Sequence, residues 1–255
     1  MVGIEAVTSS LTRRRFAVLT PLALHVAAQT GTPEPHGEAR RRMVSEISQL
    51  IAAGAGGPRE RIGLLVLEVM RRPPRHLFVP ESLRARAYES SALPIGHGAT
   101  ISQPFIVALM TDLLEPRPTD VVLEVGTGSG YQAAVLSPLV RQVFTIEIIE
   151  ALAAEAAARL AELGYANVTV RSGDGYLGLP EQAPFDKIIL TAGAERIPPA
   201  LLAQLKLGGR MVIPLGKAAE QKLAVVEKDA SGGIRIRRKI EVNFLALMLP
   251  NDSRR

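Results

Sequence analysis

Groups that could bind a nucleoside-type ligand follow three successive apolar segments of the chain. The first is the loop 126–130, which has glycine at its first, third and fifth positions, directly after the apolar run 121–125. Glycine adopts unusual φ angles at little cost and lets a ligand approach the backbone closely. Because a helical pattern starts at Tyr131, the loop also offers the free N–H groups of a helix start. The spacing indicates a binding loop, and a tight turn without a ligand is the alternative.

The loop lacks the features of the common phosphate-binding motifs. The dinucleotide fingerprint requires a third glycine at position 131, where this chain has tyrosine. The phosphate loop of nucleoside triphosphatases requires Gly-Lys followed by Ser or Thr, and no such sequence follows these glycines. We therefore expect a ligand that needs no phosphate cradle.

Acidic residues follow the next two apolar segments. Glu147 ends the segment 142–147, 21 residues beyond Gly126, which is the spacing of an acid that accepts both ribose hydroxyls. Asp174 lies between two glycines after the segment 167–171, where it can approach an adenine edge and accept from the adenine amine. The simpler alternatives are a solvated helix N-terminal acid for Glu147 and an Asx turn for Asp174. Ligands of open α/β sheets bind at the carboxyl ends of the strands, so the three groups together favour one shared site.

A ligand with a ribose, a base and no need for a phosphate cradle fits S-adenosylmethionine. Its carboxylate can accept from the loop N–H groups, and Glu124 offers an acidic partner for its amine. NAD on an oxidoreductase is the alternative, but hydride transfer needs a nearby acid or base, and none stands out in the sequence. A third alternative is a non-catalytic protein that binds the cofactor on the same fold.

The elements that position these groups alternate between strand and helix patterns. We expect an α/β fold, a doubly wound and mostly parallel Rossmann-like sheet with added N-terminal helices and C-terminal antiparallel strands. Strands are expected at 121–125, 142–147, 167–171, 186–191, 210–215, 222–228 and 234–248, the last with a break. Helices are expected at 105–114, 130–137, 149–163 and 197–205, with Gly164 ending the third of these.

The composition of the 255 residues limits the classes of function. The chain has no cysteine, which excludes disulfides, thiolate metal sites and a cysteine nucleophile, and its four histidines show no metal-ligand spacing. No metal is therefore expected. Residues 1–42 hold six arginines and three glutamates, which leaves 24 basic and 22 acidic residues in the rest of the chain. Positive and negative charges are thus nearly balanced in residues 43–255, and only 4% of the whole chain is aromatic. Neither feature is typical of a protein that binds nucleic acid, so no such partner is expected.

Residues 1–42 are interpreted as a basic extension, with one domain at 43–255. The stretch 12–28 has three arginines and then an apolar run that ends in alanines, the pattern of a twin-arginine signal for export to the periplasm. The alternatives are a disordered extension, or a chain whose translation starts at Met43. We expect a cytoplasmic protein, because S-adenosylmethionine is made in the cytoplasm and each turnover consumes one molecule. No apolar run is long enough to span a membrane, so no stable membrane association is expected, and the chain is expected to be a monomer.

Several motifs together resemble the protein-L-isoaspartate O-methyltransferase family. They are, in order, RHLFVP, LPIGHGATISQP, VLEVGTGSGYQAAVL, NVTVRSGDG, APFDKIILTAGAERIP and QLKLGGRMVIPLG. The resemblance covers about residues 43–250, and the combination of TISQP, GTGSGYQ and GDG separates this family from other methyltransferases of the class I fold. It implies methyl transfer from S-adenosylmethionine, which leaves S-adenosylhomocysteine, to the free α-carboxylate of L-isoaspartyl residues in damaged peptides and proteins, initiating their repair.

The resemblance also assigns roles to residues. The active-site serine is Ser102 of TISQP, whose alternative role is the N-cap of the helix that starts near Pro104. The sequence departs from the family at Ser90, near which an aspartate is usual, and at Ala99, where many bacterial members have glutamine. Together with the groups described above, the expected cofactor contacts are Glu124, Gly126, Thr127, Gly128, Gly130, Glu147, Asp174, Gly175 and Thr191. The expected substrate contacts are Thr100, Ile101, Gln103, Pro214, Leu215 and Gln221.

Overall fold

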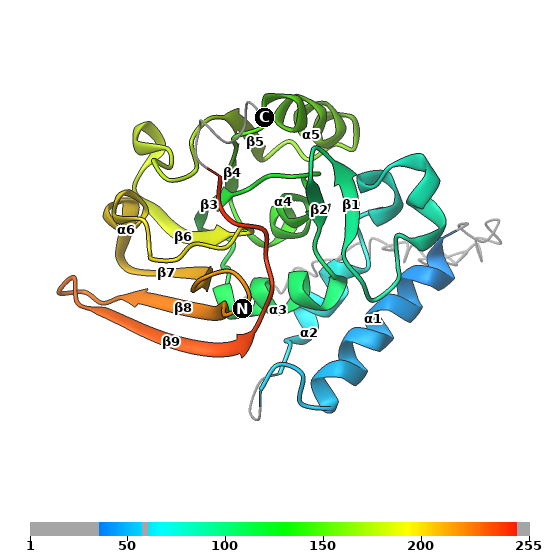
Figure 1. Cartoon of the computed structure of the whole chain (residues 1–255), viewed down its shortest axis with the longest axis horizontal. Coiled ribbons are helices and arrows are strands. Elements are labelled where there is room, and N and C mark those ends of the chain that lie inside the picture. The colour runs from blue at the N-terminus through cyan, green and yellow to red at the C-terminus, as the bar shows by residue number, and fades with distance from the viewer. Residues whose placement is uncertain (1–35, 58–60, 249–255) are drawn as a thin grey trace, which may run out of the picture. The chain divides into compact units, whose positions relative to one another are not determined.

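The computed structural model describes residues 36–57 and 61–248. Within them, seven strands form one sheet in the order β5-β4-β3-β6-β7-β8-β9, and two more, β1 and β2, form an antiparallel hairpin (Figure 1). Strands β3 to β7 run parallel, whereas β8 pairs antiparallel with both β7 and β9. The predicted fold class is confirmed. The strands are β1 (Leu93–Gly96), β2 (Ala99–Ile101), β3 (Val121–Val125), β4 (Gln142–Glu147), β5 (Val168–Ser172), β6 (Phe185–Leu190), β7 (Leu205–Leu215), β8 (Lys222–Lys228) and β9 (Ile234–Glu241).

Helices cover both faces of the sheet, and the strands are apolar on both sides for that reason. Val122 of β3 packs into a core cluster shared with the helices α1 to α5, whereas Leu123 packs into a second cluster shared with α6. Successive strand residues point to opposite faces, so the two clusters lie on opposite sides of the sheet. The helices are α1 (Gly37–Ala52), α2 (Leu64–Met70), α3 (Pro104–Leu114), α4 (Tyr131–Leu136), α5 (Glu150–Glu162) and α6 (Pro199–Gln204), with short 3-10 helices η1 (Arg75–Phe78), η2 (Glu81–Arg86), η3 (Ser137–Leu139) and η4 (Pro180–Gln182).

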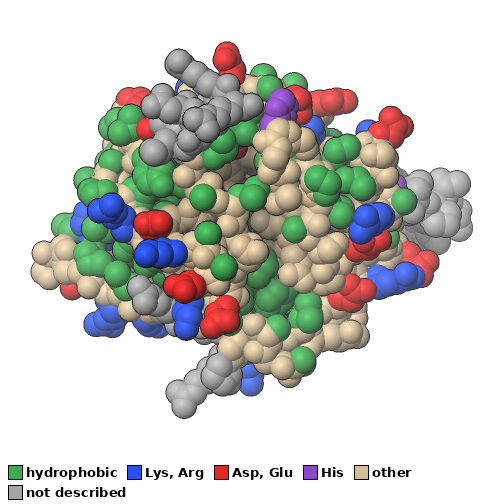
Figure 2. Space-filling model, in the orientation of Figure 1, with side chains coloured by type: hydrophobic (Ala, Val, Ile, Leu, Met, Phe, Trp, Pro, Cys, Tyr) green, Lys and Arg blue, Asp and Glu red, His purple; other side chains and the backbone are tan. Residues whose placement is uncertain are grey.

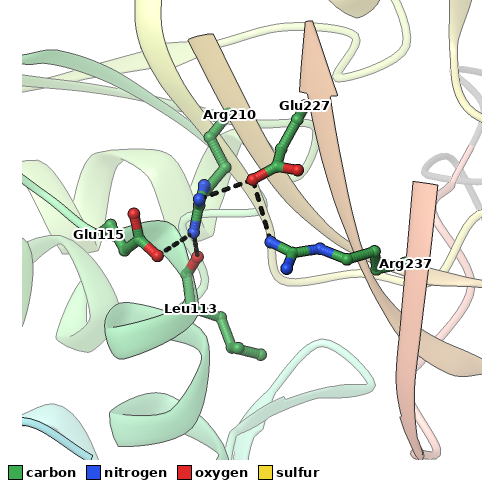
Figure 3. A network of polar contacts seen from close by, with 5 residues as sticks. All are labelled: Leu113, Glu115, Arg210, Glu227 and Arg237. Carbon is green, nitrogen blue, oxygen red and sulfur yellow. Dashed lines mark hydrogen bonds and ion pairs between the residues drawn. The ribbon is translucent and has the colours of Figure 1, made fainter. Parts of the chain in front are cut away.

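A polar network fastens the C-terminal end of α3 to the antiparallel strands (Figure 3). Arg210 of β7 donates to the carbonyl of Leu113 at 3.1 Å and forms ion pairs with Glu115 and Glu227. Glu227 of β8 also pairs with Arg237 of β9 at 3.0 Å. The β1–β2 hairpin leads directly into the N-terminus of α3. The network therefore holds the opposite, C-terminal end of that helix.

Three predicted strands match β3, β4 and β8 in both bounds. Two other predictions were wrong. β7 begins at Leu205 rather than 210, because Leu205 already pairs with Phe185 of β6, and the preceding helix is correspondingly shorter. The predicted last strand, 234–248, ends as β9 at Glu241, and the chain then crosses to pair at Ala246 with Gly193, which follows β6.

α1 reaches further toward the N-terminus than the predicted domain boundary at residue 43. It begins at Gly37, so residues 37–42 form its first turns. Met43 and Ile47 are buried in the core, whereas Arg41 and Arg42 are exposed on the same helix. The proposed signal at 12–28 lies outside the described residues and stays a prediction. Among the described helices, none has the length and apolar character needed to cross a membrane.

Candidate functional site

A cavity of about 620 Å³ lies at the carboxyl ends of β3, β4 and β6, the edge at which open α/β sheets bind ligands. Residues 99–103, here called the hairpin exit, line one part of its wall. Residues 242–248, here called the closing segment, line another part, and in Figure 1 this segment runs in red from the end of β9 across the front of the domain. In Figure 2 the middle of this face shows hydrophobic side chains mixed with uncharged polar side chains and backbone, and the charged side chains lie around it.

The glycine loop after β3 needs its glycines for two structural reasons. Gly126, Gly128 and Gly130 have φ angles of 97°, 52° and 88°, in the left-handed region that other residues rarely adopt. A Cβ on Gly126 would also lie 2.5 Å from Oγ1 of Thr191, the hydroxyl that donates to the Gly126 carbonyl. The loop is therefore a fixed turn with its backbone close to the residue that follows β6.

Glu147 connects the glycine loop to the next helix. It ends β4, is 7% exposed and lines the cavity. One carboxylate oxygen accepts from the N–H of Gly128 at 2.9 Å, and the other accepts from the N–H of Ile149 at 3.1 Å. Because Ile149 is the N-cap residue of α5, this second contact is the one expected if Glu147 acts as a helix N-terminal acid, its alternative role. The position on the cavity wall agrees with a ligand contact, which stays a prediction.

Glu124 is a fully buried carboxyl group in the middle of the site. It lies in β3, and neither of its side-chain oxygens has a hydrogen-bond partner among the described residues. Burial raises its pKa to about 8; the nearby Thr145 hydroxyl lowers the pKa in part, and the negative charge of Glu147 raises it further. A buried polar group without a partner costs about 1–3 kcal/mol. Since Glu124 lines the cavity, a donor or a cation placed there would remove this cost.

Asp174 follows β5 but does not belong to the cavity wall. Its Oδ1 accepts from the N–H of Tyr176 at 2.8 Å, which is the Asx turn expected as its alternative role. The neighbouring Gly175 is buried and lines the cavity, and a Cβ at this position would lie 2.6 Å from a side-chain carbon of Val125. The structure therefore brings Gly175 to the site, and the contact between Asp174 and an adenine amine stays a prediction.

The hairpin exit brings the predicted serine and its neighbours to the cavity wall. The residue that N-caps α3 is Gln103, so the alternative role of Ser102 as the cap is wrong. The side-chain amide of Gln103 donates to the carbonyl and to the hydroxyl of Ser90, at 3.0 Å each. Ser90, where the sequence departs from the family, therefore contacts a residue of the cavity wall, although it does not line the cavity itself. The wall includes Thr100, Ile101, Ser102 and Gln103.

Three further predicted substrate contacts lie away from the cavity wall. Pro214 and Leu215 end β7, and neither lines the cavity. Gln221 is 2% exposed and holds the backbone of Phe244, accepting from its N–H at 2.7 Å and donating to its carbonyl at 3.2 Å. Because Phe244 lines the cavity, Gln221 holds a residue of the cavity wall in place without lining the cavity itself. Direct substrate contact by these three residues stays a prediction.

The closing segment has no counterpart among the predicted site residues. Its backbone is held at Gly193, whose N–H donates to Leu245 at 2.8 Å and whose carbonyl accepts from Leu247 at 2.7 Å. Apolar residues continue past Glu241 in the sequence, and this pattern alone predicts that the strand continues. Nothing in its local pattern shows that it turns back to the sheet.

The cavity wall has no positively charged side chain among the described residues. No lysine, arginine or histidine lines it, and its carboxyl side chains are Glu124, Glu147 and Glu241, of which Glu124 is largely protonated at neutral pH without a ligand. Tyr131 also lines the cavity, and burial raises its pKa to about 12. Over the described residues, no group of three or more side chains could hold a metal ion.

Comparison with known proteins gives a consistent result. The model of the protein-L-isoaspartate(D-aspartate) O-methyltransferase family matches residues 62–251. Protein-L-isoaspartate O-methyltransferase 2 of Syntrophobacter fumaroxidans is 53% identical over 239 residues, which cover 91% of this chain and 95% of the relative. Protein-L-isoaspartate O-methyltransferase 1 of Cupriavidus necator is 49% identical, over 91% of this chain and 89% of the relative.

Solved structures agree with the fold. A protein-L-isoaspartate O-methyltransferase matches with a TM-score of 0.71 and 26% identity, over 83% of this chain and 66% of its own. A Plasmodium falciparum protein in complex with S-adenosyl-L-homocysteine matches with a TM-score of 0.66 and 22% identity, over 81% of this chain and 98% of its own.

Proposed function

Because the chain belongs to the protein-L-isoaspartate(D-aspartate) O-methyltransferase family, we propose a specific use of its cavity in the family's reaction. The reaction transfers a methyl group from S-adenosylmethionine to the free α-carboxylate of an L-isoaspartyl residue and so initiates repair of the damaged protein. We assign cofactor binding to the ends of β3, β4 and β6, and acceptor binding to the hairpin exit and the closing segment.

The observation that supports the cofactor assignment is the buried, unpartnered carboxyl of Glu124. The ammonium of the methionyl group would give it both a hydrogen bond and a counter-charge. The methionyl carboxylate would lie against the N–H groups of Thr127 and Ser129 in the glycine loop. The N–H groups of Gly126, Gly128 and Gly130 already donate within the protein and hold the turn. The adenosine would extend between Glu147 and Gly175. The residues present thus fit each part of the molecule.

The acceptor assignment is supported by the chemistry that the reaction needs. A carboxyl with an ordinary pKa near 4 is ionised at neutral pH, so no general base is required. Bound S-adenosylmethionine supplies the electrophilic methyl group. The protein must then hold a carboxylate oxygen in line with that methyl and exclude water from it. The hydroxyl of Ser102 can donate a hydrogen bond to one carboxylate oxygen and leave the other oxygen to react.

A thermal-shift and calorimetry comparison tests the cofactor assignment. S-adenosylhomocysteine should raise the melting temperature and bind with one site per chain, whereas NADH should do neither. Stabilisation by NADH alone would support the oxidoreductase alternative. A chain that binds S-adenosylhomocysteine but esterifies no isoaspartyl peptide would support the non-catalytic alternative.

We also propose that the methyltransferase domain predicted at 43–255 includes the first turns of α1, from Gly37, and that the protein works as a cytoplasmic monomer. The core clusters and the cavity both lie within these residues. Each turnover consumes one S-adenosylmethionine, which is made in the cytoplasm. Mass spectrometry of the native protein would contradict this location if it found an N-terminus at Gln29 in a periplasmic fraction.

A further inference from the structure

Arg75, the largest of the fully buried side chains, lies directly behind the cavity wall. Its Nε donates to the carbonyl of Ala87 and its Nη2 to the carbonyl of Ser102, both at 2.7 Å. The guanidinium also lies 4.6 Å from the ring centre of Tyr131, within the range of a cation–π contact. Ser102 and Tyr131 line the cavity, whereas Arg75 does not. The arginine therefore contacts two parts of the wall from the protein side.

The charge of this guanidinium is not neutralised by a carboxylate. Among the ion pairs formed by the described residues, none involves Arg75, and its Nη1 has no hydrogen-bond partner. Arginine stays protonated in proteins, so a positive charge is buried here with two carbonyls and an aromatic ring around it. Burying an unpaired charge is costly, and a fold that needed only packing would use an apolar side chain.

The acceptor is a carboxylate, and the described residues of the cavity wall include no positively charged side chain that could bind it. In a trans peptide the C=O and the N–H point in opposite directions. Because the Ser102 carbonyl points to Arg75, the N–H of the same peptide, which belongs to Gln103, points away from Arg75. A charge-assisted bond to the carbonyl also polarises that peptide and strengthens the N–H as a donor.

We propose that Arg75 is a positioning residue for the acceptor carboxylate: its guanidinium fixes and polarises the Ser102–Gln103 peptide, so that this peptide's N–H and the Ser102 hydroxyl face the cavity. Arg75 acts through Ser102 and does not touch the substrate. The inference rests on the proposed function, in which the hairpin exit receives the acceptor.

The test compares Arg75→Met and Arg75→Lys with the wild type and with a matched control, Arg86→Met. Arg86 lies in η2, is exposed and pairs with Glu89 at 3.0 Å, so its replacement removes an arginine charge from the same region without touching the wall. Calorimetry with S-adenosylhomocysteine gives the number of binding sites per chain, and so the fraction of each variant that is folded. Kinetics with an isoaspartyl peptide give KM and kcat per folded site.

A second ligand separates a positioning role from a structural one. It is the same peptide with its α-carboxylate replaced by a carboxamide, used as a competitive inhibitor. Arg75→Met should raise KM for the isoaspartyl peptide about tenfold and reduce the preference for carboxylate over carboxamide by a similar factor, with S-adenosylhomocysteine affinity within about twofold of the wild type. Arg75→Lys should restore part of that preference, and Arg86→Met should change nothing.

Equal weakening of both peptides in Arg75→Met would overturn the proposal, because the effect would not depend on the acceptor's charge. Loss of S-adenosylhomocysteine binding in both Arg75 variants would also overturn it, since Arg75 would then be holding the fold. A wild-type chain that esterifies no isoaspartyl peptide would contradict the proposed function instead, and that result is obtained before any variant is made.

Discussion

The binding of S-adenosylhomocysteine should become weaker as the pH falls from 8 to 6, because of Glu124. The pKa of this carboxyl is raised from its ordinary value of 4.5 to about 8 by burial, so it is mostly protonated at pH 6 in the protein without ligand. A bound ammonium favours the ionised form and lowers the pKa again. The ligand therefore displaces a proton at low pH, and this proton release reduces its affinity.

The size of the effect follows from the two pKa values. If the bound ammonium returns the pKa to its ordinary range, affinity changes about tenfold per pH unit below 8, and the total change between pH 8 and pH 6 is about 50-fold. Close to one proton should be released per ligand bound at pH 6. Calorimetry at each pH, repeated in two buffers that differ in ionisation enthalpy, measures both quantities.

Glu124→Gln is the matched control, since glutamine has nearly the same shape and does not titrate. The affinity of this variant for S-adenosylhomocysteine should be lower than that of the wild type at pH 8 and nearly independent of pH between 6 and 8. The ligand's own amine also titrates near the upper end of this range, and the variant measures that contribution separately. A wild-type affinity that does not change with pH, or that changes as much in Glu124→Gln, would refute the placement of the ammonium.

Three other variants test the remaining assignments. Ser102→Ala should lower kcat about 10- to 100-fold with an unchanged melting temperature, since Ser102 caps no helix; a fall in stability without a fall in kcat would contradict its role. Asp174→Asn keeps an acceptor for the Asx turn but offers a donor to adenine, so calorimetry should show weaker S-adenosylhomocysteine binding, by about 1–3 kcal/mol, and equal affinity would leave Asp174 with the turn alone. Gln221→Ala should release Phe244 and speed chymotrypsin cleavage there, whereas the exposed Lys222→Ala should not; equal cleavage rates would contradict the clamp.

The fold was predictable because its strands are short apolar runs separated by strong turn signals. β3 and β4 are recognisable from branched residues that end in a glycine loop and in an acid, and the parallel order follows from the helix patterns between them. The end of β9 was not predictable, because apolar residues continue past it. The turn to Gly193 depends on pairing with a residue about 50 positions earlier, which local periodicity does not report.

The site was predictable to the extent that it follows strand ends. Glu124, Glu147 and Gly175 reach the cavity because each belongs to or follows a parallel strand that ends at this edge. Gln221 was expected to contact substrate, but the structure places it behind Phe244. Arg75 belongs to the motif RHLFVP, yet a sequence gives no sign that an arginine will be fully buried, because arginine is usually exposed.

Methyl transfer to paired peptides tests the central claim most directly. The chain is incubated with S-adenosylmethionine labelled in its methyl group and with two peptides that differ only in an L-isoaspartyl or an ordinary aspartyl linkage at one position. We predict that label enters the isoaspartyl peptide as a base-labile methyl ester and that the aspartyl peptide stays unlabelled. Equal labelling of the two peptides, or labelling of neither by a chain that binds S-adenosylhomocysteine, would contradict the account.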